Sequence, residues 1–318
     1  MPRRKTPFEW WQDKISTLTG YKDEAKRLYS FVGSAYLQGY WTLLKLAIFA
    51  YYIDVYTVVA KSNFNRILYI DLFAGSGLNE IGIGKHKEIL LGSALLAKKV
   101  PRKGKEFDEI ILVEQDPEKA AVLEQLLPES TVINDDCNSP DTLKEILDRI
   151  NEEPRTHFLA VIDPEGLELK WNTVQTLIEL QGDSVINYMC AGVGRSWGNI
   201  YSPKQQDSIK VKLERTLTEF FGNNKWKDCV PPTQGGSVEC LFDLYYNQVK
   251  KFKQNSVPIT VRGIKGFHYH IIVAVRKTRG TQGWIDAIYR AKHQIEKISE
   301  SEIKKLFEIY RGKQAQLW

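Results

Sequence analysis

Cysteine is scarce in this sequence of 318 residues, and its few cysteines lie far apart. They are Cys137, Cys190, Cys229 and Cys240, and no two of them form a C-x-x-C motif. Cysteine that is this sparse and lacks such a motif argues against a disulfide framework or a zinc knuckle. Sparse, unpaired cysteine is typical of a reducing compartment, and we therefore expect a cytoplasmic protein.

The sequence also lacks an apolar leader and a long uncharged apolar run. Its start, M-P-R-R-K-T-P, is basic but is not followed by an apolar stretch, which argues against a secretory signal. The most apolar segment, residues 43–59, contains Lys45 and Asp54 and is rich in tyrosine. We expect this segment to be a buried helix rather than a membrane span.

Internal repeats, low-complexity tracts and linkers are absent as well, and 43% hydrophobic with 26% charged residues is ordinary for a globular chain. The net charge of +5 is unevenly distributed. Residues 250–318 contain 15 Lys and Arg against 5 Asp and Glu, whereas the preceding 249 contain 29 against 34. The basic end is consistent with nucleic acid or an acidic partner, and equally with solvated lysine-rich helices.

Short apolar runs alternate with helical patterns along most of the chain. The runs predict strands at residues 67–70, 110–113, 131–133, 158–162, 185–189, 259–262 and 269–275. This alternation predicts an α/β fold with a doubly wound, mostly parallel seven-stranded sheet. We expect a helical extension over residues 1–60, the α/β domain over 61–280, and basic helices over 281–318.

Glycine marks three connections in this scheme. The first predicted strand ends at Asp71 and is followed by Gly75 and Gly77. Residues 79–91 are expected to form a loop over this glycine turn, with Ser93 as the N-cap of the next helix. Residues 191–195, A-G-V-G-R, are expected to form a second glycine-rich turn, and a last hairpin would turn around Gly263 and Gly266.

The glycine turn lacks the features of a phosphate-binding loop. In a G-x-G-x-x-G motif the third glycine would replace Glu80, and the next strand-end acid, Glu114, lies 37 residues beyond Gly77 rather than about 20. The segment 82–85 does not have the spacing of a G-x-x-x-x-G-K-[ST] loop. A dinucleotide cofactor, and with it a nicotinamide-dependent oxidoreductase, is therefore disfavoured.

S-adenosylmethionine, which has no phosphate, fits the pattern better. Its amino-acid arm needs a glycine turn, its ribose hydroxyls need an acid on the second strand, and its adenine needs polar contacts at the end of the third. A carboxylate accepts two hydroxyls through strong charge-assisted hydrogen bonds. The predicted cofactor-binding residues are Asp71, Phe73, Gly75, Gly77, Glu114, Gln115, Asp136 and Cys137.

The end of the fourth strand faces the reacting methyl group in such an architecture. Asp163 is therefore the candidate that orients or deprotonates an acceptor, with the Pro164 carbonyl as a second contact. D-P-E-G at residues 163–166 retains only the first half of the D-P-P-[FY] pattern of base-methylating enzymes. The alternative for Asp163 is a helix cap.

Two further groups of residues, one after the fifth strand and one on the last strand, contain side chains that bind ligands in other proteins. Gly194, Arg195 and Trp197 follow the fifth strand and are predicted to bind the acceptor, with Arg195 available for a phosphate. His268 and His270 share one face of the last strand, but no matching ligand spacing accompanies them. We interpret them as structural histidines and predict no metal site.

Several sequence segments, spread over residues 40–285, match one protein family. They are Y-I-D-L-F-A-G-S-G (69–77), G-S-A-L-L-A (92–97), V-E-Q-D-P (113–117), A-V-I-D-P-E-G (160–166), F-F-G (220–222) and H-Y-H-I-I-V-A-V-R (268–276), with Trp171, Thr173 and Trp226. The chain thereby resembles the three-Cys-motif partner (TcmP) proteins, a prokaryotic group with a class I methyltransferase fold. The resemblance implies a partner protein that itself carries the cysteine motif. Ser76 and Glu165 depart from the family pattern.

These observations predict an S-adenosylmethionine-dependent methyltransferase of the TcmP type, acting on nucleic acid or protein. The alternative hypothesis is a non-catalytic module on a methyltransferase scaffold that binds nucleic acid or a partner protein. The basic end of the chain and the incomplete D-P-P-[FY] motif favour that alternative.

Overall fold

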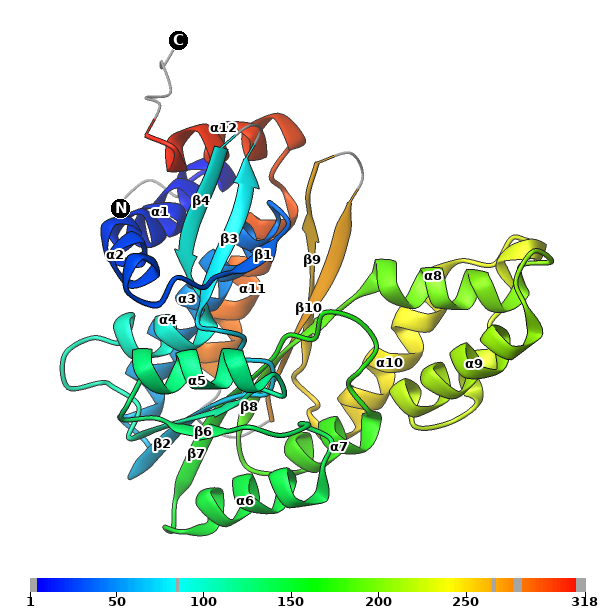
Figure 1. Cartoon of the computed structure of the whole chain (residues 1–318), viewed down its shortest axis with the longest axis horizontal. Coiled ribbons are helices and arrows are strands. Elements are labelled where there is room, and N and C mark those ends of the chain that lie inside the picture. The colour runs from blue at the N-terminus through cyan, green and yellow to red at the C-terminus, as the bar shows by residue number, and fades with distance from the viewer. Residues whose placement is uncertain (1–4, 84–85, 265–266, 277–281, 313–318) are drawn as a thin grey trace.

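A seven-stranded, mostly parallel sheet forms the centre of the computed structural model, which describes residues 5–83, 86–264, 267–276 and 282–312 (Figure 1). Its strand order is β6-β5-β2-β7-β8-β10-β9, and β10 runs antiparallel to both of its neighbours. The strands are β2 (Arg66–Asp71), β5 (Glu109–Val113), β6 (Thr131–Ile133), β7 (Thr156–Ile162), β8 (Asp183–Tyr188), β9 (Val257–Arg262) and β10 (His268–Ala274). The prediction of a doubly wound α/β sheet is confirmed.

The strand order creates a crevice beside β2. The chain first builds outward from β2 to β5 and β6, and then returns to add β7 and β8 on the other side of β2. In open α/β sheets, ligands bind where the strand order reverses, outside the carboxyl ends of the strands. Every residue of β2 is buried, because helices cover both faces of the sheet.

Helices on the two faces of the sheet form two separate hydrophobic cores (Figure 1). One core includes residues of α1 (Pro7–Gly20), α2 (Lys22–Val32), α3 (Thr42–Ala60), α4 (Ser93–Lys99), α5 (Pro117–Leu126), α11 (Gln282–Glu296) and α12 (Glu300–Tyr310). The other includes residues of α6 (Pro140–Asn151), α7 (Trp171–Glu179), α8 (Cys190–Tyr201), α9 (Asp207–Phe221) and α10 (Val238–Phe252). The two ends of the chain thus contribute to the same core.

The apolar helix α3 lies inside the protein. By length and composition it could span a membrane, but 72% of its most apolar window is buried. Its residues are apolar on every side, which is typical of a helix surrounded by protein. The prediction of a buried helix in this segment is confirmed.

Residues 79–91 form strands rather than the predicted loop. β3 (Leu78–Ile83) and β4 (His86–Leu91) pair as a hairpin, and β1 (Tyr36–Gln38) joins β3 in parallel to complete a second, three-stranded sheet. Ile81 and Ile89 are buried, and the two strands pair residue by residue along their length, whereas glycine in this segment had suggested a loop. Gly84 and Lys85 lie outside the described residues, as does Gly266 in the predicted turn between β9 and β10.

The glycine-rich turn predicted at residues 191–195 is the first part of helix α8. Val193, Trp197 and Ile200 recur at helical spacing and are all buried, and this packing outweighs the low helix propensity of the glycines. The Ser93 prediction is also wrong, because Gly92 holds the N-cap position of α4 and makes no side-chain cap. Ser93 is instead buried at the pocket.

Two of the four cysteines form a disulfide, which contradicts the prediction of unpaired cysteine. Cys229 and Cys240 are joined across 11 residues with their Cα atoms 5.9 Å apart. The chain reverses between them at Gly235, with a φ of +84°, and Gly236, where a Cβ atom would collide with the carbonyl oxygen of Val230. Spacing in the sequence does not reveal this reversal. The other two cysteines are free and buried.

Candidate functional site

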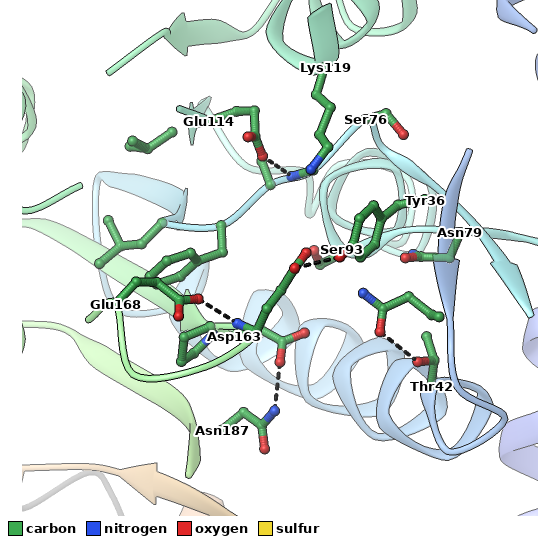
Figure 2. A pocket seen from close by; sticks show the side chains of 18 of the residues that line it. Tyr36, Thr42, Ser76, Asn79, Ser93, Glu114, Lys119, Asp163, Glu168 and Asn187 are labelled. Carbon is green, nitrogen blue, oxygen red and sulfur yellow. Dashed lines mark hydrogen bonds between the residues drawn. The ribbon is translucent and has the colours of Figure 1, made fainter. Parts of the chain in front are cut away.

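A pocket of about 780 Å³ opens at the carboxyl ends of the central parallel strands (Figure 2). Its floor is the turn after β2, and its walls come from the segments that follow β5, β6, β7 and β8. The segment around β1 and the start of α3 closes it from the opposite side. The pocket therefore occupies the crevice that the strand order creates.

The glycine turn has the backbone geometry that only glycine adopts readily. Gly75 and Gly77 have φ angles of +61° and +76°. The N–H of Gly92 donates to the carbonyl of Gly77 at 2.7 Å, and a Cβ atom on Gly92 would lie 2.8 Å from that oxygen. This close approach ties the turn to the start of α4 and leaves the Gly75 backbone open toward the pocket.

Asp71 is fully buried directly beneath the turn. Its carboxylate accepts hydrogen bonds from the Phe73 N–H and the Tyr69 hydroxyl, both at 3.1 Å. Burial raises the pKa of Asp71 to about 6, since removal from water disfavours the charged form. The prediction of an acid at this strand end is correct in position, but Asp71 supports the turn from below and does not itself line the pocket.

Glu114 links the ends of two neighbouring strands. One carboxylate oxygen accepts the N–H of Gly75 at 2.8 Å, and the other accepts the N–H of Asp116 at 2.9 Å. The side chain reaches the turn after β2 from the end of β5, so it fixes both segments. Glu114 lines the pocket and remains able to accept further hydrogen bonds.

The remaining predicted cofactor residues also line the pocket; they are Phe73, Gln115, Asp136 and Cys137. Asp136 accepts hydrogen bonds from the backbone N–H of Asn138 at 2.9 Å and from its side-chain amide at 2.8 Å. Burial raises the pKa of the Cys137 thiol well above its usual value. The structure therefore brings together the residues that the sequence predicted at three successive strand ends.

Asp163 and Pro164 lie at the far end of the same pocket, and Asp163 is held in an ion pair. The Lys45 ammonium lies 2.7 Å from one carboxylate oxygen. The Asn187 amide donates to the other oxygen at 2.7 Å, as Figure 2 shows. The helix that follows is capped at Lys170, so Asp163 is not a helix cap. Lys45 and Asn187 thus fix the position of the Asp163 side chain.

Lys45 and Asn187 were missed in the sequence. Lys45 is the only cation in the apolar segment 43–59, and a buried cation of this kind requires a partner. A single lysine in an apolar segment was therefore the feature of the sequence that could have indicated a buried ion pair. Asn187 lies in the middle of an otherwise apolar strand run, and only the sheet order shows that β8 places it beside Asp163.

Aromatic and hydroxyl groups complete this end of the pocket. Trp41 and Phe267 stack with ring centroids 4.4 Å apart, and both line the pocket. The Tyr269 hydroxyl is buried at the pocket and has no hydrogen-bond partner among the described residues. Burial raises the pKa of Tyr36 to about 12, and the Tyr36 hydroxyl donates to the Glu165 carboxylate across the pocket.

The three residues predicted to bind the acceptor do not line the pocket. Gly194, Arg195 and Trp197 lie on α8, where Trp197 is buried in the second core and the Arg195 guanidinium donates to the Ala191 carbonyl at 3.3 Å. Their predicted position depended on a turn at 191–195. Because that segment is helical, these residues do not reach the pocket.

The basic end of the chain retains only part of its charge for a partner. The buried Lys253 donates to the carbonyls of Leu180 and Gly182, and Arg276 donates to the Glu179 carbonyl. Lys292 and Lys304 pair with glutamates one helical turn away. These four basic side chains therefore have partners within the chain.

A scan against protein-family models finds no match, and a search of curated proteins also finds none. Among solved structures, the chain is similar to a Legionella pneumophila protein of the family DUF519, with a TM-score of 0.39, 12% identity, and coverage of 78% of this chain and 92% of that one.

Two plantazolicin methyltransferases are also similar. BpumL, solved with SAH, has a TM-score of 0.32 and 10% identity over 84% of this chain and 100% of that one. BamL, solved with SAH and a triazolic desmethylPZN analog, has a TM-score of 0.33 and 10% identity over 96% and 92%. Similarities at this level do not identify a function.

Proposed function

We propose that the chain is an S-adenosylmethionine-dependent methyltransferase. The observation that carries the proposal is the joining of three strand ends around one pocket. The glycine turn after β2, Glu114 after β5 and Asp136 after β6 all meet there, with Asp163 at the far end. This arrangement offers backbone N–H groups, a carboxylate for a diol and polar groups for a purine, in that order along the pocket.

The pocket fits such a cofactor in size and in chemistry. Its volume of about 780 Å³ is within the usual range of about 300–1,000 Å³ for small-molecule sites. The open backbone at Gly75 lets a ligand approach without a side chain in the way. Glu114 and Asp136 would accept hydrogen bonds from ribose hydroxyls and from the adenine side, and Phe73 would supply apolar contact.

The end of the pocket around Asp163 can orient the group that would accept the methyl. S-adenosylmethionine supplies an electrophilic methyl group when it is bound. The ionised Asp163, held by Lys45 and Asn187, accepts a hydrogen bond from an N–H or O–H and so fixes the attacking lone pair. Asp163 would therefore position the acceptor, and the proton that the acceptor loses on methylation would pass to this carboxylate or to water.

Calorimetry with S-adenosylmethionine and with S-adenosylhomocysteine tests the cofactor site. Glu114→Gln removes the charge and leaves only one of the two acceptor oxygens that hold the Gly75 and Asp116 N–H groups, so we expect affinity to fall by roughly 10–100-fold. Glu118→Gln is the matched control, because Glu118 is exposed on the neighbouring helix α5, and it should leave affinity unchanged. Absence of binding by the unaltered chain, or equal affinity in both variants, would refute the proposal.

A labelled-methyl assay on pools of nucleic acid and protein tests catalysis separately. Asp163→Asn should bind S-adenosylmethionine as the unaltered chain does but transfer methyl groups far more slowly. Cofactor binding without transfer to any pool, in both proteins, would favour a non-catalytic binding module. Transfer that Asp163→Asn leaves unchanged would remove Asp163 from the reaction centre.

We further propose that the chain is of the TcmP type and works with a partner protein that carries the cysteine motif. The matching segments around the pocket, 69–77, 113–117 and 160–166, support this proposal. Affinity capture of the tagged chain should recover a cysteine-motif protein encoded nearby, and capture without one would argue against it.

A cytoplasmic location makes a separate prediction for the Cys229–Cys240 pair. Thiol labelling during lysis should find both residues reduced in a cytoplasmic protein. Complete protection of the pair from labelling would indicate an oxidising compartment instead.

A further inference from the structure

Outside the pocket, the structure gathers three side chains that ligate transition metals. The thiol of Cys190 and one ring nitrogen each from His268 and His270 all lie within 4.8 Å of one another. Cys190 is the first residue of α8, and the two histidines belong to β10. Cys190 precedes the two histidines by 78 and 80 positions in the sequence, which is why spacing alone shows no ligand motif.

Sheet pairing brings this cluster together. His268 and His270 are two residues apart on one strand, so their side chains leave the same face. β10 runs antiparallel to β8, and His270 is paired with Tyr188 in that register. Cys190 follows Tyr188 by two residues, at the point where the chain leaves the sheet, and therefore returns to the same face beside the histidines.

The environment of His270 prepares it as a ligand. The Thr260 hydroxyl on β9 lies 3.2 Å from its Nδ1 atom, which leaves Nε2 for another partner. Phe242 of α10 stacks on the ring at 3.9 Å and fixes its plane. A hydrogen bond at one ring nitrogen orients a histidine that binds a metal through the other.

A negative charge lies beside the cluster. Glu239 lies in the first turn of α10, where the Ser237 hydroxyl donates to its carboxylate. An ion bound by one thiolate and two neutral imidazoles retains a net positive charge. The position of Glu239 would offset that charge.

We propose that Cys190, His268 and His270 form a binding site for a divalent transition metal ion with a tetrahedral preference, in the first place Zn²⁺. Zinc takes mixed sulfur and imidazole ligands at about 2.0–2.3 Å, which places ligand atoms roughly 3.3–3.8 Å apart. The 4.8 Å limit on the ligand-atom separations in the cluster is about 1 Å above this range. Soft sulfur and nitrogen donors exclude Mg²⁺ and Ca²⁺.

The site would connect α8 to β10 directly behind the pocket. Asn187 and Met189, which line the pocket, immediately precede Cys190. A metal bridge would hold the carboxyl end of β8, and with it the amide that supports Asp163. The proposal concerns a structural site and stands whether or not the chain transfers methyl groups.

Titration of the untagged, metal-free chain with Zn²⁺ and Co²⁺ tests the site. We expect one ion per chain by elemental analysis, a rise in the thermal midpoint, and for Co²⁺ a sulfur-to-cobalt charge-transfer band with tetrahedral ligand-field absorption. Cys190→Ser should abolish the charge-transfer band, and His270→Gln should weaken binding at least 100-fold. Thr260→Val, which removes only the outer hydrogen bond, should weaken binding by roughly 10–100-fold.

Matched variants exclude other ligands. Cys137→Ser, His293→Gln and the double variant Cys229→Ser/Cys240→Ser alter the remaining free cysteine, an exposed histidine and the disulfide, and each should bind Co²⁺ with the same spectrum. Absence of stoichiometric binding by the unaltered chain would overturn the proposal. A Co²⁺ spectrum that persists in folded Cys190→Ser and His268→Gln variants would overturn it as well.

Discussion

The two ends of the pocket are built in different ways. The end proposed for the cofactor depends on backbone and carboxylates from short local segments, the turn 71–77 and the residues directly after β5 and β6. The acceptor end depends on single side chains from separate elements: Lys45 on α3, Asp163 after β7, Asn187 on β8 and Tyr269 on β10. The residues of the first end are therefore set by short local segments, whereas those of the second come together only in the folded chain.

This difference has an energetic counterpart. At the cofactor end, the Glu114 carboxylate accepts hydrogen bonds from the backbone N–H groups of Gly75 and Asp116. At the acceptor end, the charge of Asp163 depends on Lys45, a residue more than 100 positions away in the sequence. Removal of a single partner should therefore disturb the acceptor end much more than the cofactor end.

Lys45→Met should produce the largest effect. The pair with Asp163 is almost completely buried, with side-chain exposures of 10% and 14%. Removal of one partner from a buried pair leaves an uncompensated charge and costs about 3–5 kcal/mol. Urea denaturation at neutral pH should show this loss, and the double variant Lys45→Met/Asp163→Asn should recover most of it.

An exposed pair provides the comparison for that experiment. Lys98 and Glu129 form an ion pair with side-chain exposures of 45% and 75%, so Lys98→Met should cost less than about 1 kcal/mol. If the losses in Lys45→Met and Asp163→Asn simply add in the double variant, the two residues do not depend on each other, and the proposed acceptor end loses its basis.

Asp71→Asn should produce a smaller and pH-dependent effect. Burial raises the pKa of Asp71 from 3.8 to about 6, so the folded state binds more protons than the unfolded state between these values. The stability that this carboxyl contributes is therefore present at low pH and is lost as the pH rises from about 4 to about 6. Relative to the unaltered chain, Asp71→Asn should gain as much as about 3 kcal/mol above pH 7.

Unfolding free energies measured from pH 4 to pH 8 check this expectation. The gain in Asp71→Asn should shrink toward zero near pH 4. Cofactor affinity should fall above about pH 6, where Asp71 is ionised, because the turn then loses its charged support. The exposed Asp207→Asn should stay within about 0.5 kcal/mol of the unaltered chain throughout. A stability difference that does not vary with pH would show that Asp71 is not held in its buried, destabilised form.

The sequence predicted those features whose cause is local. The run at residues 67–70 is apolar without interruption, and its burial in the centre of the sheet follows directly from that pattern. Glu114 and Asp136 stand at the ends of similar runs, and parallel strands bring such ends to one edge of a sheet. Fold class and cofactor end could therefore be predicted without the structure.

Features that depend on distant contacts could not be predicted. The salt bridge of Lys45 and the pairing of β1 with β3 join segments whose proximity no local pattern encodes. The disulfide requires the reversal at Gly235, and the cluster of Cys190 with the two histidines requires the register of β10 on β8. In the segment 191–195 the glycines suggested a turn, whereas buried residues at helical spacing determined the helix.

Gly75→Ala should produce the smallest of the stability effects and the most selective one. Gly75 has a φ of +61°, a conformation that costs a residue with a Cβ atom roughly 1–2 kcal/mol, although no atom lies within 4 Å of the added Cβ. The strain should move the Gly75 N–H away from Glu114 and weaken cofactor binding beyond the loss of stability. Gly82→Ala is the matched control, since Gly82 also has open space but no positive φ. Calorimetry and urea denaturation on both variants separate the two readouts, and equal cofactor affinity in Gly75→Ala and Gly82→Ala would show that the ligand does not depend on the conformation of the turn.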